Sequence, residues 1–243
     1  MQFENILYTP LDTDPIPEFN INQMYSWLQT SHVAQERWRR RIGRLTSESS
    51  GIKVTYPWNI SLAYFNMTGK GPGWLNDFDQ QFPDLSKYFV NCFGFNFDDV
   101  GSIIMLPMKD DAVGPGFYHQ DHDWYGLRLY LEFEDRDNNS LLLKKTKIPY
   151  DKQAMIQTPI DESLLQNEEV KAKILNNRYC WYINNVRACH STFVAKPGSR
   201  RLAVIFTSRF TNFDNVLPRI KELVLKSAEK YSDYVIKWSP EAL

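Results

Sequence analysis

Residues 117–128 read FYHQDHDWYGLR, and from Leu127 onward apolar and polar residues alternate along the chain. One set of alternate positions is apolar and carries Leu127, Leu129, Leu131 and Phe133. The other set carries Arg128, Tyr130, Glu132 and Glu134. Alternate side chains leave opposite faces of an extended strand. The segment therefore predicts a strand with one face in a core and the other facing solvent or a polar cavity.

Strand-like segments on both sides of this one predict a mainly β fold with flanking helices. The further strands are expected at 55–66, 100–108, 140–148, 178–183, 186–195 and 201–209. Segment 140–148 is expected to pair with the 127–134 strand across a turn at 135–139. A proline-containing lead-in (1–18) and a loop at 109–116 are also expected. One or two helices are expected over 20–38, with a break around Thr30-Ser31. Further helices are expected at 74–93, with a start or kink at Pro83, at 161–176, and from 215 toward Tyr234.

Composition and charge limit the classes of function. The chain has 243 residues, 43% hydrophobic and 14% aromatic, which favours one globular domain with a sizeable core. A formal net charge of −1 gives no overall field for nucleic acid or an anionic membrane, and the arginine cluster at 37–44 is interpreted as a solvated helix face. The three cysteines have no disulfide or zinc spacing, and no signal peptide or membrane span is visible. A cytoplasmic protein of unknown oligomeric state is expected.

His119 and Asp121 are candidate metal ligands because side chains two residues apart leave the same face of a strand. With one distant histidine, His190, they offer the two-histidine, one-carboxylate set that iron(II) accepts, leaving positions open for substrates. His122 falls on the opposite face by its spacing and is interpreted as a neighbouring or surface residue. Asp123 shares the face of Asp121 and stays an alternative ligand.

Arg200 and Arg201 are candidates for binding the remote carboxylate of a 2-oxo dicarboxylic acid, because a guanidinium binds a carboxylate with two parallel hydrogen bonds. If Pro197-Gly198 forms a two-residue hairpin loop, position 194 pairs with 201 and Arg201 shares a face with His190. If the loop has three residues, Arg200 does. Both arginines stay open. Arg128 is either a further ligand-binding residue or an ion-pair partner of Glu132 or Glu134.

The pattern of His119, Asp121, Arg128, His190 and an arginine ten or eleven residues later resembles the iron(II) and 2-oxoglutarate-dependent oxygenases. It is most similar to the aspartyl/asparaginyl β-hydroxylase-like branch, which includes enzymes acting on free amino acids; phytanoyl-type oxygenases also contain His-Gln-Asp. The resemblance implies a double-stranded β-helix, a cupin-like jelly roll, within a single domain. Its parts would be a helical N-terminal region (about 1–98), the jelly-roll core (about 99–209) and a C-terminal helix (about 215–236).

The resemblance also implies chemistry. Fe(II) would be held by His119, Asp121 and His190, and 2-oxoglutarate by Arg200 or Arg201, with Arg128 helping to bind it or facing the substrate. Dioxygen would be the second cosubstrate. The expected reaction is hydroxylation of an unactivated carbon in a small polar molecule such as an amino acid. A non-catalytic jelly-roll binding module, and an oxygenase acting on a peptide or protein side chain, are the alternatives.

Overall fold

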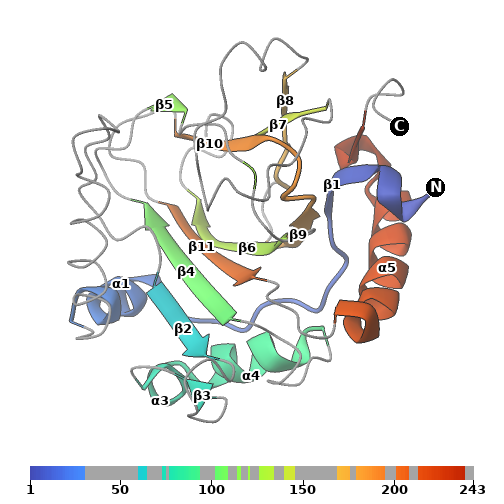
Figure 1. Ribbon diagram of the computed structural model, residues 1–243. Helices are drawn as coiled ribbons and strands as arrows, with labels where there is room; N and C mark the ends of the chain where they lie inside the picture. The colour runs from blue at the N-terminus through green and yellow to red at the C-terminus, as the bar shows by residue number, and fades with distance from the viewer. Residues whose placement is uncertain are drawn as a thin grey trace.

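The computed structural model describes residues 1–30, 60–64, 73–74, 77–93, 102–108, 114–115, 120, 126–133, 140–145, 169–175, 179–194, 201–207 and 213–238. In these ranges the chain forms two antiparallel sheets with helices around them (Figure 1). This arrangement confirms the mainly β prediction. None of the helices in the described part of the chain is long and apolar enough to cross a membrane.

The larger sheet has eight strands. In spatial order they are β12 (Ile236–Lys237), β1 (Ile6–Pro10), β9 (Trp181–Asn184), β6 (Gly126–Phe133), β11 (Arg201–Thr207), β4 (Ser102–Met108), β2 (Ile60–Tyr64) and β3 (Gly73–Trp74). The smaller sheet has four strands, in the order β5 (Gly114–Pro115), β10 (His190–Val194), β7 (Ser140–Lys144) and β8 (Glu169–Lys171). Figure 1 shows the smaller sheet above the larger one. The extended lead-in contributes β1, between β9 and β12.

From β4 to β11 the chain passes repeatedly between the two sheets. β4, β6, β9 and β11 belong to the larger sheet, and β5, β7, β8 and β10 belong to the smaller one. Two sequence predictions are wrong for this reason. β7 pairs with β10 and β8 rather than with β6, and the hairpin between β10 and β11 does not exist, because Arg201 pairs with Met108 and Phe133. β11 lies along one edge of β6, and β9 pairs with residues 126–129 on the other edge.

The helices lie on the larger sheet and around its edge. They are η1 (Phe3–Asn5), α1 (Ile21–Thr30), α3 (Phe78–Gln81), α4 (Pro83–Asn91), α5 (Phe213–Lys230) and η4 (Ser232–Tyr234). The side chain of Asn20 accepts hydrogen bonds from the amides of Asn22 and Gln23, which caps the start of α1. Pro83 begins α4, where its missing N–H is tolerated. The predicted helices from residue 20 and from 215 are therefore confirmed over their described parts, and residues 31–38 lie outside the described ranges. The 74–93 segment is helical at α3 and α4, but its helix begins later than predicted because Trp74 lies in β3.

The predicted helix at 161–176 is wrong over its described part. Residues 169–171 form β8, and Val170 pairs with Leu143. The amide of Ala172 also donates to the carbonyl of Leu141 at 2.8 Å. Pairing with β7 and burial of Ala172 outweighed a helix propensity that is only a weak preference per residue. Residues 161–168 lie outside the described ranges. Within the predicted loop at 109–116, Gly114–Pro115 forms β5 and pairs with β10.

Two hydrophobic clusters lie on opposite faces of the larger sheet. The outer cluster joins Leu127, Leu129, Trp181 and Val204 to apolar residues of the helices. The inner cluster joins Tyr182 and Ala203 of the larger sheet to Leu141 and Leu143 of the smaller one. Strand alternation therefore sends Leu127 and Leu129 of β6 toward the helices and Arg128, between them, toward the space between the sheets.

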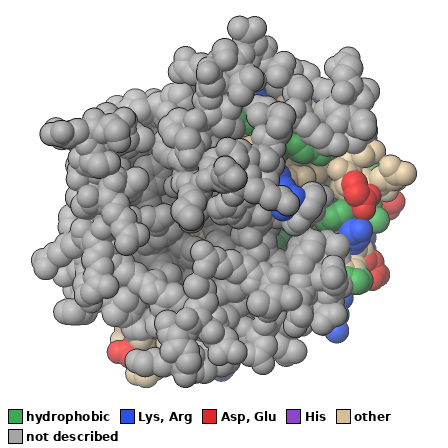
Figure 2. All heavy atoms as spheres, in the orientation of Figure 1, with side chains coloured by type: hydrophobic (Ala, Val, Ile, Leu, Met, Phe, Trp, Pro, Cys, Tyr) green, Lys and Arg blue, Asp and Glu red, His purple; other side chains and the backbone are tan. Residues whose placement is uncertain are grey.

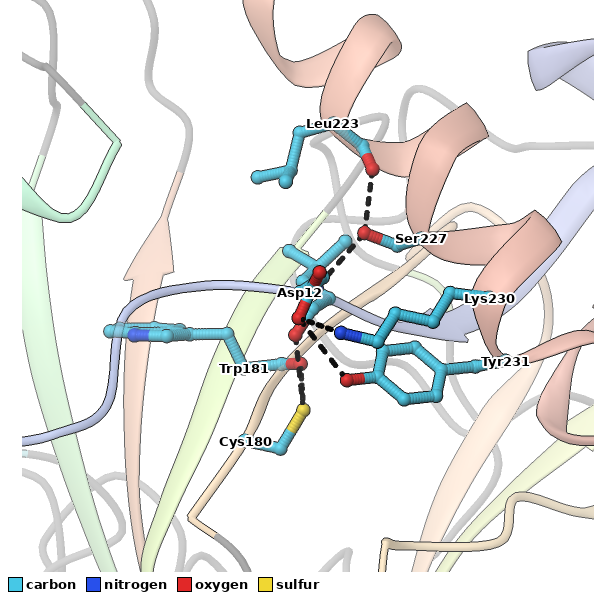
Figure 3. A network of polar contacts seen from close by, with 8 residues as sticks. Asp12, Cys180, Trp181, Leu223, Ser227, Lys230 and Tyr231 are labelled. Carbon is cyan, nitrogen blue, oxygen red and sulfur yellow. Dashed lines mark hydrogen bonds and ion pairs between the residues drawn. The ribbon is translucent and has the colours of Figure 1, made fainter.

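A polar network attaches α5 to the segment that follows β1 (Figure 3). The amide of Asp12 donates to Oγ of Ser227 at 2.9 Å, and Ser227 donates to the carbonyl of Leu223 at 2.6 Å. Lys230 Nζ lies 2.7 Å from Oδ1 of Asp12, to which the Tyr231 hydroxyl also donates. As in this network, acidic and basic side chains lie close to one another on the described part of the surface (Figure 2). The C-terminal helix is thus tied to the edge of the larger sheet.

Candidate functional site

His190 is a buried residue on the inner face of the smaller sheet. It is 0% exposed and pairs directly with Leu143, whose side chain belongs to the inner cluster. Directly paired residues of antiparallel strands place their side chains on the same face. His190 therefore faces the space between the two sheets.

A hydrogen bond sets the tautomer of His190. Its Nδ1 lies 2.9 Å from the carbonyl oxygen of Ala188. A carbonyl oxygen only accepts, so Nδ1 carries the proton, and Nε2, which is buried, is the nitrogen with a lone pair. Metal-binding histidines in proteins are commonly held this way, with the distal nitrogen donating to a carbonyl. The described part of the predicted ligand set therefore fits a metal.

His119 and Asp121 lie outside the described residues, but the residue between them is described. Gln120 donates from Nε2 to the backbone carbonyl of Arg187 at 2.8 Å. Arg187 lies in the turn between β9 and β10, three residues before His190. This contact places the residue between the two candidate ligands against the turn that leads into His190.

The turn before His190 is organised by Asn185. Its side-chain oxygen accepts from the amide of Arg187 at 3.1 Å, and its carbonyl accepts from the amide of Ala188. Its own amide donates to the carbonyl of Leu7 at 2.8 Å, which attaches the turn to β1. Asparagine favours such turns because its short side chain bonds to nearby backbone amides. The sequence places the turn at 184–185, between the predicted strands 178–183 and 186–195. Asn184 instead ends β9 and the next strand begins only at His190, so the turn lies later than predicted. Its attachment to β1 depends on sheet order and has no local signal.

Arg128 lies on the inner face of the larger sheet. It is 6% exposed and sits between Tyr182 of β9 and Ile205 of β11. Among the residues that the structure describes, none accepts a hydrogen bond from its Nε or forms an ion pair with it. Glu134 and the Glu132 side chain lie outside the description. A buried guanidinium is costly unless an anion compensates it, so this position suits a ligand carboxylate.

The two arginines predicted to bind 2-oxoglutarate are described only in part. Arg201 is the first residue of β11 and pairs with Met108 and Phe133, and nothing is described of its side chain. Arg200, His122 and Asp123 lie outside the described ranges. The choice between the two arginines, and between Asp121 and Asp123, stays a prediction.

Cys189 and Lys144 lie beside His190 without forming a nucleophilic site. Burial raises the pKa of the Cys189 thiol to about 12, and the nearby Lys144 ammonium only partly opposes this. Lys144 Nζ lies 3.5 Å from Oε2 of Glu169, on the neighbouring strand β8. A thiol that stays protonated at neutral pH is a poor nucleophile. No group of three or more possible ligands occurs among the described side chains, which exclude His119 and Asp121.

Comparisons with known proteins give weak similarities only. No family model matches the chain, and no curated protein matches it in sequence. Among solved structures, AviO1 from Streptomyces viridochromogenes Tue57 is 11% identical with a TM-score of 0.41, over 86% of this chain and 92% of that one. SnoK, a non-heme alpha ketoglutarate dependent carbocyclase from nogalamycin biosynthesis, is 9% identical with a TM-score of 0.44, over 84% and 80%. HygX from Streptomyces hygroscopicus, with nickel and 2-oxoglutarate bound, is 14% identical with a TM-score of 0.36, over 86% of each chain. Similarities this low do not establish a shared fold or activity.

Proposed function

We propose that this chain is an Fe(II)- and 2-oxoglutarate-dependent dioxygenase that hydroxylates an unactivated carbon of a small polar substrate such as an amino acid. The observation that carries the proposal is His190, buried between the sheets with Nδ1 donating to the carbonyl of Ala188. The contact of Gln120 with Arg187 supports it, since Gln120 separates the other two proposed ligands, His119 and Asp121.

The fold that goes with this function is the double-stranded β-helix. In this proposal β4 to β11 form the jelly roll, with the iron site near the β9–β10 turn. The support is the passage of these eight strands between two antiparallel sheets, as in double-sheet jelly rolls. Their inner faces supply both the apolar inner cluster and the buried polar residues Arg128 and His190.

The chain's own residues would bind and orient the reactants. When bound, iron(II) supplies the redox chemistry that couples decarboxylation of 2-oxoglutarate to substrate oxidation by dioxygen. The carbonyl of Ala188 keeps the proton of His190 on Nδ1 and directs Nε2 toward a metal. Arg200 or Arg201 would hold the remote carboxylate of 2-oxoglutarate, and Arg128 would bind a second carboxylate. The sheets on both sides exclude bulk water, which strengthens these electrostatic contacts.

Anaerobic addition of Fe(II) and 2-oxoglutarate to the purified protein tests the proposal. The expected result is a weak visible charge-transfer band that is lost in His190→Ala. Thr9→Ser, a conservative change at a buried site on β1, is the control and should keep the band. If folded wild-type protein gives no band, the oxygenase proposal fails and a non-catalytic binding module becomes the better explanation. If the band forms but only peptides stimulate succinate release, the small-substrate part fails.

A further inference from the structure

Asn184 is a buried polar residue to which the proposed function gives no role. It ends β9 and is 0% exposed. Among the described residues, neither Nδ2 nor Oδ1 of its side chain has a hydrogen-bond partner. Buried amides are nearly always hydrogen-bonded, so one that has both a donor and an acceptor to offer needs an explanation.

Asn184 lies on the same inner face as Arg128. In the pairing of β6 with β9, Asn184 stands opposite Gly126, and Tyr182 stands opposite Arg128. Tyr182 belongs to the inner cluster, so Asn184, two residues later, also faces the space between the sheets. Asn184 and Arg128 are therefore diagonal neighbours on adjacent strands, a separation that long side chains can bridge.

The side-chain amide of Asn184 lies over Gly126, on the strand that carries Arg128. A Cβ built on Gly126 would lie 3.4 Å from Oδ1 of Asn184, so the amide leans over β6 two residues before Arg128. Arg128 Nε is also buried and has no partner among the described residues. The two side chains together offer N–H donors from both residues and one carbonyl acceptor from Asn184.

We propose that Asn184 and Arg128 form a recognition site for a carboxylate with a hydrogen-bond donor on the adjacent carbon, as in 2-amino and 2-hydroxy acids. Arg128 and the Nδ2 group of Asn184 donate to the carboxylate, and Oδ1 of Asn184 accepts from the ammonium or hydroxyl group. 2-Oxoglutarate at neutral pH carries acceptors only and leaves Oδ1 without a donor. The site therefore binds the substrate rather than the cosubstrate. This assignment to the substrate is the only part of the inference that rests on the proposed function.

The test measures binding by thermal shift with matched pairs of small acids. Alanine and lactate are compared with propanoate, and aspartate and malate with succinate, with and without Fe(II) and 2-oxoglutarate under anaerobic conditions. In the wild type, at least one amino or hydroxy acid is expected to raise Tm more than its unsubstituted partner. Asn184→Leu is expected to weaken that binding about 10- to 100-fold, because it removes hydrogen bonds to charged groups. Asn184→Asp should also abolish it, because the new carboxylate pairs with Arg128.

Two controls separate binding from stability. Without ligand, Asn184→Leu should unfold at the same temperature as the wild type or higher, since the amide has no hydrogen-bond partner to lose among the described residues. Ser227→Ala, in the network beneath α5, should lower Tm but keep the ligand-induced shift. The inference is overturned if no acid binds, if unsubstituted acids bind equally well, or if Asn184→Leu binds like the wild type. It is also overturned if Asn184→Leu lowers the ligand-free Tm as Ser227→Ala does, which would indicate that a buried water satisfies the amide. Failure of the oxygenase proposal would appear separately, as loss of the charge-transfer band in the wild type.

Discussion

Gly126 is a position in the β6–β9 pair that has no room for a side chain. A Cβ at this position would lie 2.8 Å from Cγ1 of Val186. Gly126→Ala should therefore lower the free energy of unfolding by about 1–3 kcal/mol, the usual effect of overpacking. Because the contact is with one side-chain atom, Val186→Ala should recover part of the loss. Urea unfolding of both single variants and the double variant gives the coupling energy. Strictly additive effects would contradict the steric explanation.

At the scale of single residues, the sequence could identify candidates but not their surroundings. His190 was selected because it is the one histidine that follows the 119–122 segment, and it falls on a predicted strand. Its direction into the interior depends on the pairing of β10 with β7, which no local spacing predicts. Gln120 and Asn184 were missed because amides carry no metal or acid-base signature. What marks them is a specific contact in one case and complete burial in the other.

The attachment of α5 should depend more on Ser227 than on the adjacent ion pair. Ser227 is 0% exposed and is hydrogen-bonded both to the amide of Asp12 and to the carbonyl of Leu223. Ser227→Ala should therefore destabilise the protein by about 1 kcal/mol. Lys230→Ala should have a smaller effect, because half-exposed surface ion pairs are screened by water. Chemical denaturation of both variants measures how much unfolding free energy each one loses. An equal or larger loss in Lys230→Ala than in Ser227→Ala would contradict the prediction.

Among the elements, those whose boundaries have local causes were predictable from sequence. Asn20 and Pro83 start helices for reasons contained in their own side chains. The segment that forms β8 was predicted as a helix because its composition favours one, whereas β7 offers it backbone partners that the local sequence does not reveal. Helix starts with a local cause were therefore easier to predict than a strand that forms only because a distant strand pairs with it.

The stability of the whole molecule should fall at alkaline pH. Burial raises the pKa of Cys189 from 9.0 to about 12 and that of Tyr88 from 10.0 to about 12. The folded chain therefore keeps these protons after the unfolded chain has released them, and the free energy of unfolding decreases as pH rises through this range. In Cys189→Ala, the free energy of unfolding should decrease less steeply with pH than in the wild type. Denaturation series from pH 8 upward, which start roughly one unit below the ordinary thiol pKa, measure this slope.

Ser232→Ala, at an exposed position that does not titrate, is the matched control for that series and should keep the wild-type slope. If Cys189→Ala and the wild type gave parallel curves, the thiol would not contribute to the pH dependence. Burial of Cys92 raises its pKa as well, so part of the decrease should persist in Cys189→Ala.

The order of strands in the two sheets is the property of the whole molecule that the sequence left least determined. Turn residues predict that a chain reverses, but not whether the next strand joins the same sheet or the opposite one. Here β7 joins the opposite sheet, where it pairs with β10 and β8 and buries Leu141 and Leu143 between the sheets.

The hydrogen bond from Gln120 to the carbonyl of Arg187 makes the two positions unequal in the substitutions they tolerate. Every amino acid supplies a backbone carbonyl, so position 187 can change its side chain freely without losing this link. Position 120 needs a side chain that is long enough and ends in a donor, which few residues provide. Substitutions that keep this hydrogen bond should therefore be more varied at position 187 than at position 120.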